Sequence, residues 1–237
     1  MSTVDILAIA AHPDDVELTC GGLLIRMGDL GYRTGVLDLT RGELGTRGSA
    51  EIRSREAAEA AKIMGLQWRG NADLPDSRLT LDDASRAAVA ACIRRLCPTL
   101  VILPCDGQRH PDHNAACAIG YAGIFAAGVG KFPVEGAAHR PAQVLYAVAD
   151  ERQEPSFYID ITAQMERKLR AVAAYRSQFD EMPAQPIDAL GDDVYSRLMC
   201  AARACGLRGG VRFAESYRIR QALLVDDPLA QLRLKPV

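Results

Sequence analysis

Short apolar runs alternate with longer segments of helical periodicity along the first half of the chain. Three apolar runs have the length and composition of buried strands: residues 4–10, 34–39 and 100–103. The segments expected to form helices lie between and after them: residues 17–30, 51–64, 82–96 and 112–127. Gly31 and Gly65 are placed to end two of these helices, and Asp82 or Asp83 to cap a third.

The alternation weakens beyond about residue 130. The strands expected there are residues 143–148, 157–161 and 218–224, and the expected helices are residues 164–175 and 193–203. Strands that alternate with helices predict an α/β fold, in which helices wrap a mostly parallel sheet. We interpret residues 1–237 as a single domain. Residues 1–130 would form its core, and the less regular residues 131–237 would complete the sheet and the substrate pocket.

Charge and hydropathy narrow the class of protein. Charged residues make up 24% of the chain, its net charge is −2, and its arginines are scattered. Nucleic-acid binders usually carry a basic run, so we expect no nucleic-acid partner. No apolar run approaches the roughly 18 residues that a membrane span needs, and the first residues lack the features of a signal peptide. We therefore expect a soluble, cytoplasmic protein without a membrane partner.

The cysteines suggest neither disulfides nor a thiolate metal site. The chain has seven, an odd number, and no two of them form a Cys-x-x-Cys pair. Reduced thiols in a cytosolic protein are the simpler interpretation.

Histidines and aspartates gather in two short motifs. The sequences HPDD at residues 12–15 and HPDH at residues 110–113 each follow an expected strand, and together they hold three of the four histidines. Ligands of α/β sheets bind beyond the carboxyl ends of the strands, where both motifs would lie. A catalytic zinc takes three protein ligands and keeps one position open. His12, Asp15 and His113 can supply that set.

Each motif also has a plainer interpretation. His-Pro-Asp can be a turn or a helix start, because proline and aspartate favour both. Two such motifs at the same edge of the sheet favour a metal site instead. His139 has no acidic neighbour in the sequence, and we interpret it as a surface or structural residue.

Adjacent carboxylates suggest a division of labour. Asp14 and Asp15 cannot both point the same way from an extended turn, so one would bind the metal while the other takes a proton from water. Asp14 could instead cap the following helix. His110 could donate a hydrogen bond to an oxyanion or protonate a leaving amine, unless its role is structural.

Three segments together resemble the PIG-L/LmbE-like N-acetylglucosaminyl deacetylases. They are AHPDDVELTCGG (residues 11–22), TRGELGTRG (40–48) and Pro111-Asp112-His113. Within that family, the chain is similar to the bacillithiol-biosynthesis enzymes that deacetylate N-acetylglucosaminyl malate. The resemblance implies a Rossmann-like fold and one zinc ion. It also implies roles for individual residues: His12, Asp15 and His113 as ligands, Asp14 as general base, and His110 as acid or electrophilic partner.

Arginines are the residues expected to contact the substrate. The resemblance implies this role for Arg53, in the helix after TRGELGTRG, with Arg55 as the competing match. Arg109, Arg47 and Glu43 lie in loops at the same edge, where an arginine could bind a carboxylate-bearing aglycone. Each of these three could equally be a solvated surface charge.

Several functional alternatives remain at this point. The substrate could be N-acetylglucosaminyl malate, a chitooligosaccharide or the amide of a thiol conjugate. An alternative of a different class is a non-catalytic protein that binds sugars or nucleotides. No G-x-G-x-x-G follows the first strand, which argues against a dinucleotide site. A His/His/carboxylate set also accepts ferrous iron. Relatives are often homo-oligomers, so we expect one here.

Overall fold

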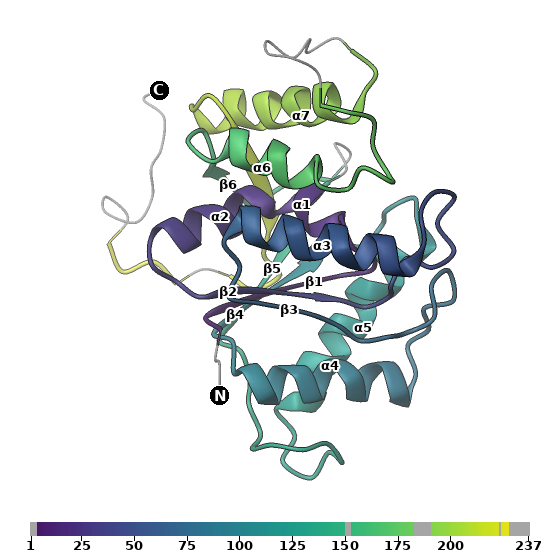
Figure 1. Cartoon of the computed structure of the whole chain (residues 1–237). Coiled ribbons are helices and arrows are strands. Elements are labelled where there is room, and N and C mark those ends of the chain that lie inside the picture. Colours follow the sequence, from purple (N-terminus) through teal and green to yellow (C-terminus); the bar gives the residue numbers. More distant parts are fainter. Residues whose placement is uncertain (1–3, 150–152, 183–190, 223, 228–237) are drawn as a thin grey trace.

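A seven-stranded sheet with helices on both faces forms the centre of the computed structural model (Figure 1). The structure describes residues 4–149, 153–182, 191–222 and 224–227. The strands are β1 (Ile6–Ala10), β2 (Thr34–Asp38), β3 (Trp68–Asn71), β4 (Leu100–Pro104), β5 (Gln143–Ala147), β6 (Phe157–Asp160) and β7 (Ala214–Arg218). Their spatial order is β3-β2-β1-β4-β5-β7-β6. The first five are parallel, and β7 runs antiparallel to both of its neighbours. The predicted Rossmann-like α/β fold is confirmed.

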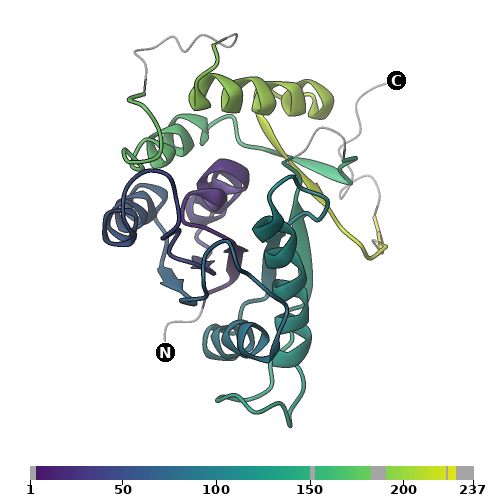
Figure 2. The same ribbon diagram turned by 90° about the vertical axis from the view of Figure 1, so that its right-hand side faces the viewer.

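Helices cover both faces of this sheet. The described helices are α1 (Asp15–Thr19), α2 (Gly21–Asp29), α3 (Ala50–Met64), α4 (Asp83–Leu96), α5 (Pro111–Ala127), α6 (Met165–Val172) and α7 (Val194–Gly209). Helices α4 and α5 pack on one face, and α1, α2, α3 and α6 lie on the other (Figures 1 and 2). Helix α7 packs on β6 and β7 at the far end of the sheet. Over the described residues, no helix combines the length and apolar composition that a membrane span needs.

The parallel register brings the loops after the strands to one edge. Ala10 pairs with Asp38, and Asp38 pairs with Asn71, so the ends of β1, β2 and β3 lie level. His12 follows β1 directly, and the HPDH motif follows β4, which is the other neighbour of β1. The sheet therefore places both motifs at the same edge, as predicted.

The predicted helix 17–30 is wrong in one respect, because it is broken at Cys20, where φ is −127° and ψ is 14°. The backbone amides of Gly22 and Leu23 each donate to the carboxylate of Glu215 on β7, both at 2.8 Å. A Cβ on Gly22 would lie 2.7 Å from Glu215 Oε1, which explains why glycine suits this close approach. The break thus depends on a partner almost two hundred residues away in sequence.

Other boundaries were only partly predicted. Gly65, at a φ of 76°, ends α3, and Asp82 caps α4, both as expected. Strand β3 was missed, because Arg69 and Gly70 give it no apolar alternation. The closing strand is Ala214–Arg218 instead of residues 218–224.

Two helix ends also differ from the prediction. Helix α6 ends at Val172 instead of residue 175, and α7 continues to Gly209 instead of residue 203. Gly210, in the left-handed region at a φ of 77°, ends α7. Helical periodicity alone did not reveal these ends.

Candidate metal centre

The two motifs are held where strands give way to helices. His12 lies in the turn between β1 and α1, and Asp15 is the first residue of α1. His110 is the N-cap residue of α5, and His113 lies in its first turn, after the proline that begins the helix. Asp14 adopts a φ of 106°, a conformation that a non-glycine side chain rarely occupies. Strain of this kind is typical of functional sites.

Two imidazole nitrogens converge on the Asp15 carboxylate. His12 Nδ1 lies 3.4 Å from Asp15 Oδ2, and His113 Nε2 lies 3.1 Å from Asp15 Oδ1. The backbone amide of His12 also donates to Asp15 Oδ2 at 2.9 Å, which fixes the carboxylate in the turn. The structure therefore brings together the three predicted metal ligands.

The other nitrogen of His113 is held by Gln108. His113 Nδ1 lies 2.8 Å from Gln108 Oε1, while Gln108 Nε2 donates to the carbonyl oxygen of Cys105 at 2.9 Å. That second bond identifies Oε1 as the acceptor, so His113 carries its proton on Nδ1. The lone pair of Nε2 is left facing Asp15, in the tautomer that a metal ligand needs.

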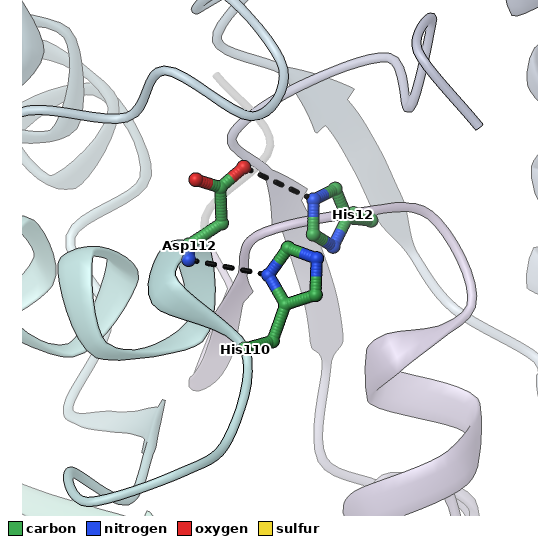
Figure 3. A group of neighbouring side chains, drawn as sticks. All are labelled: His12, His110 and Asp112. Carbon is green, nitrogen blue, oxygen red and sulfur yellow. Dashed lines mark hydrogen bonds and ion pairs between the residues drawn. The ribbon is translucent and has the colours of Figure 1, made fainter.

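His12 is oriented in the same way by carboxylates. Its Nε2 lies 3.1 Å from Asp76 Oδ1. The same nitrogen lies 3.3 Å from Asp112 Oδ2 (Figure 3). Asp76 also accepts from the backbone amide of Leu44, and Asp112 from that of Ser77, each at 2.8 Å. A proton on Nε2 satisfies the carboxylates and leaves the lone pair of Nδ1 facing Asp15.

This donor set suits a tetrahedral zinc ion. His12, Asp15 and His113 each offer one ligand atom, and these three atoms lie within 4.8 Å of one another. Two imidazoles and a carboxylate are among the ligands that zinc takes, and they leave the fourth tetrahedral position open. A second group, His12, His110 and Asp112, also has its candidate atoms within 4.8 Å of one another. In that group His12 contacts Asp112 through Nε2, the nitrogen that also contacts Asp76. The hydrogen bonds thus favour the first set.

The surroundings of the site favour a cation. Burial lowers the pKa of His12, but the hydrogen bond with Asp15 and the charges of Asp15, Asp76 and Asp14 outweigh it and raise that pKa to about 9. Burial acts to raise the pKa of Asp15, yet His113 and His12 hold it well below its ordinary value. An excess of carboxylates therefore stabilises a positive charge here, whether a proton or a metal ion provides it.

Asp14 faces away from the ligands, toward Arg53. Arg53 Nη2 lies 3.0 Å from Asp14 Oδ2 and also donates to the carbonyl oxygen of Pro13. Arg53 Nη1 donates to the carbonyl oxygen of Gly42 at 3.3 Å, where a Cβ would lie only 2.0 Å from that nitrogen. Burial and the charge of Asp15 raise the pKa of Asp14 well above its ordinary value, and Arg53 partly opposes them. Asp14 is thus a buried carboxylate with raised basicity, and it makes no capping bond to α1.

His110 closes the other side of the site. Its Nδ1 accepts from the backbone amide of Asp112 at 3.2 Å, so the neutral ring carries its proton on Nε2 (Figure 3). Its ring centre lies 5.1 Å from that of His12 and 5.0 Å from that of His113. Burial, with help from His113 and His12, lowers the pKa of His110 and so favours this neutral form.

The arginines predicted to bind substrate differ in exposure. Arg53 is only 5% exposed, and Arg109 is exposed beside His110. The competitor Arg55 points outward from the same helix and contacts the backbone of Glu51. Arg47 makes an exposed ion pair with Asp180. Of the two competing positions in α3, only Arg53 reaches the site, where it contacts Asp14.

The sequence analysis missed two residues that orient the ligands, Asp76 and Gln108. Asp76 lies in a loop after β3 and is 3% exposed, and its backbone amide donates to Glu43 Oε1 at 2.8 Å. Gln108 lies between β4 and α5. Each is a single polar residue without a motif. Only the proximity of Gln108 to HPDH could have drawn attention to it.

Comparisons with known proteins relate the chain to de-N-acetylases. The family described as "PIG-L: GlcNAc-PI de-N-acetylase" matches residues 7–123. A diacetylchitobiose deacetylase of Thermococcus kodakarensis is 30% identical over 189 residues, which cover 74% of this chain and 70% of that protein. A Bacillus cereus protein named "Probable N-acetyl-alpha-D-glucosaminyl L-malate deacetylase 2" is 29% identical over 195 residues, which cover 75% and 84%.

A solved structure extends the likeness to most of the chain. The crystal structure of a conserved protein from Thermus thermophilus superposes with a TM-score of 0.85 at 38% identity, covering 94% of this chain and 98% of that one. The residues brought together at the sheet edge lie within or close to the part that the family matches. The chain belongs to the PIG-L family of de-N-acetylases.

Proposed function

We propose that this chain is a zinc-dependent deacetylase that hydrolyses the acetamide of an N-acetylglucosamine-type substrate. The observation that carries the proposal is the convergence of His12 Nδ1 and His113 Nε2 on the Asp15 carboxylate, with the buried Asp14 beside them. The names of the relatives from Thermococcus and Bacillus support this substrate class.

Each residue has a distinct task in the proposed reaction. Zinc held by His12, Asp15 and His113 would polarise the amide carbonyl and make a water molecule more acidic. Asp14 accepts the proton of the attacking water, because burial makes its carboxylate a stronger base. The Nε2 proton of His110 can stabilise the developing oxyanion or pass to the leaving amine.

Arg53 acts mainly on Asp14 in this proposal. Its guanidinium is buried and bonded to Asp14 and to two backbone carbonyls, which aims the carboxylate. A direct contact between Arg53 and substrate stays a prediction. The exposed Arg109 is the proposed partner of an acidic aglycone.

The preferred substrate is N-acetylglucosaminyl malate, as in bacillithiol biosynthesis, and the Bacillus relative supports this choice. A chitooligosaccharide is the second candidate, which the Thermococcus relative supports. The cytoplasmic location and the homo-oligomer stay predictions.

The test is acetate release by the zinc-loaded chain. N-acetylglucosaminyl malate, diacetylchitobiose and free N-acetylglucosamine would be compared, each with and without removal of the metal. We expect metal-dependent hydrolysis and the highest kcat/KM for the malate conjugate. Preference for diacetylchitobiose would change the assigned substrate, and no acetate release from any of the three would refute the proposal.

A further inference from the structure

A large cavity opens directly from the metal centre. Its volume is about 490 Å³, and Asp15, His113 and Gln108 form the end at the metal centre. From there it runs between α1, the ends of β5 to β7, and α7. Among the described residues that line it, neither Asp14 nor His110 is present. The cavity therefore extends from the ligand side of the centre, away from the general base.

The walls of this cavity are largely apolar. Helix α7 contributes a stripe of small and apolar side chains at helical spacing: Val194, Leu198, Ala201, Ala202 and Cys205. Leu18, Val148 and Tyr158 are among the residues opposite. An apolar wall of this kind favours an apolar ligand group over a sugar ring.

The buried charged groups of the wall, Lys168 and Glu215, are paired with each other. Lys168 Nζ lies 2.6 Å from Glu215 Oε1, and both side chains are buried. The Glu215 carboxylate also accepts from two backbone amides of α2 and from the Tyr217 hydroxyl. Further cationic side chains, Arg197 and Arg208, lie at exposed positions of α7. The inner part of the cavity thus offers no unpaired carboxylate to bind a sugar hydroxyl.

Covalent connectivity identifies the part of a substrate that would enter. The carbonyl of the scissile amide must lie at the metal ligands, and its acyl chain begins at that same carbon. A glycosidic substituent is separated from the carbonyl by the amide nitrogen and two ring carbons. Asp14 and His110, which handle the water and the amine, lie outside the cavity. The sugar therefore belongs on their side, and the acyl chain belongs in the cavity.

We propose that this chain also hydrolyses amino-sugar amides with apolar acyl chains longer than acetyl, with the chain bound in the α7 cavity. The proposal rests on the deacetylase function proposed above. Water supplies the new C–O bond, the C–N bond breaks, and a fatty carboxylate and the free amine are released. A cavity of this volume lies in the range that accommodates drug-sized ligands, well beyond the needs of one methyl group.

The test compares N-acetyl-, N-butyryl- and N-hexanoylglucosamine with the zinc-loaded full chain. Each buried methylene can contribute a factor of about four, so kcat/KM should rise at least about tenfold from acetyl to hexanoyl. Hexanoate should also inhibit more strongly than acetate, because the product keeps the same chain. A kcat/KM that falls as the chain lengthens would overturn the inference while deacetylation stood. If none of the three substrates were hydrolysed, both proposals would be refuted.

A pair of neighbouring substitutions on α7 locates the effect. Ala201→Phe places a ring in the cavity and should lower the hexanoyl-to-acetyl ratio of kcat/KM at least about tenfold. Cys200→Phe, exposed and outside the described cavity lining, is the matched control and should keep the ratio. An unchanged ratio in Ala201→Phe would contradict the assignment. A second result would also contradict it. If the octyl glycoside of N-acetylglucosamine had a higher kcat/KM than free N-acetylglucosamine, and Ala201→Phe abolished that increase, the cavity would hold the aglycone and not the acyl chain.

Discussion

The metal centre and the α7 cavity are built in contrasting ways. At the metal centre, both nitrogens of each ligand histidine face an acceptor or the shared carboxylate, and the ligands come from two short motifs. Away from the metal ligands, the cavity is lined largely by apolar side chains from segments that are far apart in the sequence, most of them in the C-terminal part. The contrast indicates that local sequence specifies the candidate ligands, whereas long-range packing shapes the cavity beside them.

Glu215 connects the two regions. Its carboxylate lies at the start of α2, soon after the HPDD motif, and pairs with Lys168 beneath the cavity. A change at Glu215 should therefore disturb the packing of the C-terminal part more than the donor atoms of the centre.

The largest effect is expected at the metal centre, from His113→Ala. This change removes one of three ligands, so zinc should be lost and kcat/KM should fall by at least about a thousandfold. Zinc content by atomic emission and acetate release would be measured together. His139→Ala is the control, because His139 Nε2 contacts the carbonyl oxygen of Pro98 and His139 lies outside the HPDD and HPDH motifs. Full zinc occupancy in His113→Ala would refute the ligand assignment.

Glu215→Gln tests the cavity side of the comparison, through the stability of its buried ion pair. It leaves the buried Lys168 ammonium without its charged partner, which should cost about 3–5 kcal/mol of unfolding free energy. Denaturant unfolding would measure this loss. The double variant Lys168→Met/Glu215→Gln should recover part of it. A loss below about 1 kcal/mol would show that the pair does not anchor the C-terminal part.

Asp76→Asn tests whether Asp76 orients His12 for metal binding. The amide is a weaker acceptor for the Nε2 proton of His12, so zinc affinity should fall by about 10–100-fold. Competition with a chromogenic chelator would measure it. Asp73→Asn changes an exposed carboxylate that pairs with Arg41, and it should leave the affinity as it is. Equal zinc affinities in Asp76→Asn and Asp73→Asn would show that Asp76 does not position His12.

Arg53→Gln should produce the smallest change, in the pH profile. In the proposed reaction Asp14 acts as a carboxylate, so the rate should fall as pH drops through the pKa of Asp14. Arg53 lowers that pKa, so its removal should raise the pKa and move the acidic limb to higher pH. Arg53→Lys keeps the charge and should retain most of the limb, and Arg55→Gln on the outer face of α3 should not shift it. If the acidic limb stayed in place in Arg53→Gln, Arg53 would have no effect on the pKa of Asp14, and the account would be wrong on this point.

The sequence predicted features that depend on neighbours along the chain. The parallel strands, the helix ends at Gly65 and Asp82, and the meeting of the two histidine motifs follow from local patterns. The break at Cys20 could not be predicted from local sequence, because the backbone amides that follow it donate to Glu215 on β7. Strand β3 was missed because its pairing with β2 defines it better than its own residues do.

The candidate site shows the same limit. The three ligands carry a recognisable spacing, and the resemblance to a known family added the roles of Asp14 and His110. Asp76 and Gln108 fix the histidine tautomers, yet nothing near Asp76 in sequence indicates it. Arg53 was expected to bind substrate, but its burial against Asp14 emerges only when α3 is packed.

The central claim is that adjacent carboxylates have different tasks, with Asp15 on the metal and Asp14 on the water. The most direct test is the zinc content of Asp14→Asn and Asp15→Asn, measured with kcat on the same preparations. We predict that Asp14→Asn keeps about one zinc per chain while kcat falls by roughly 10²–10⁴-fold, and that Asp15→Asn loses the metal. If Asp14→Asn lost its zinc while Asp15→Asn kept both metal and activity, the two roles would have to be exchanged.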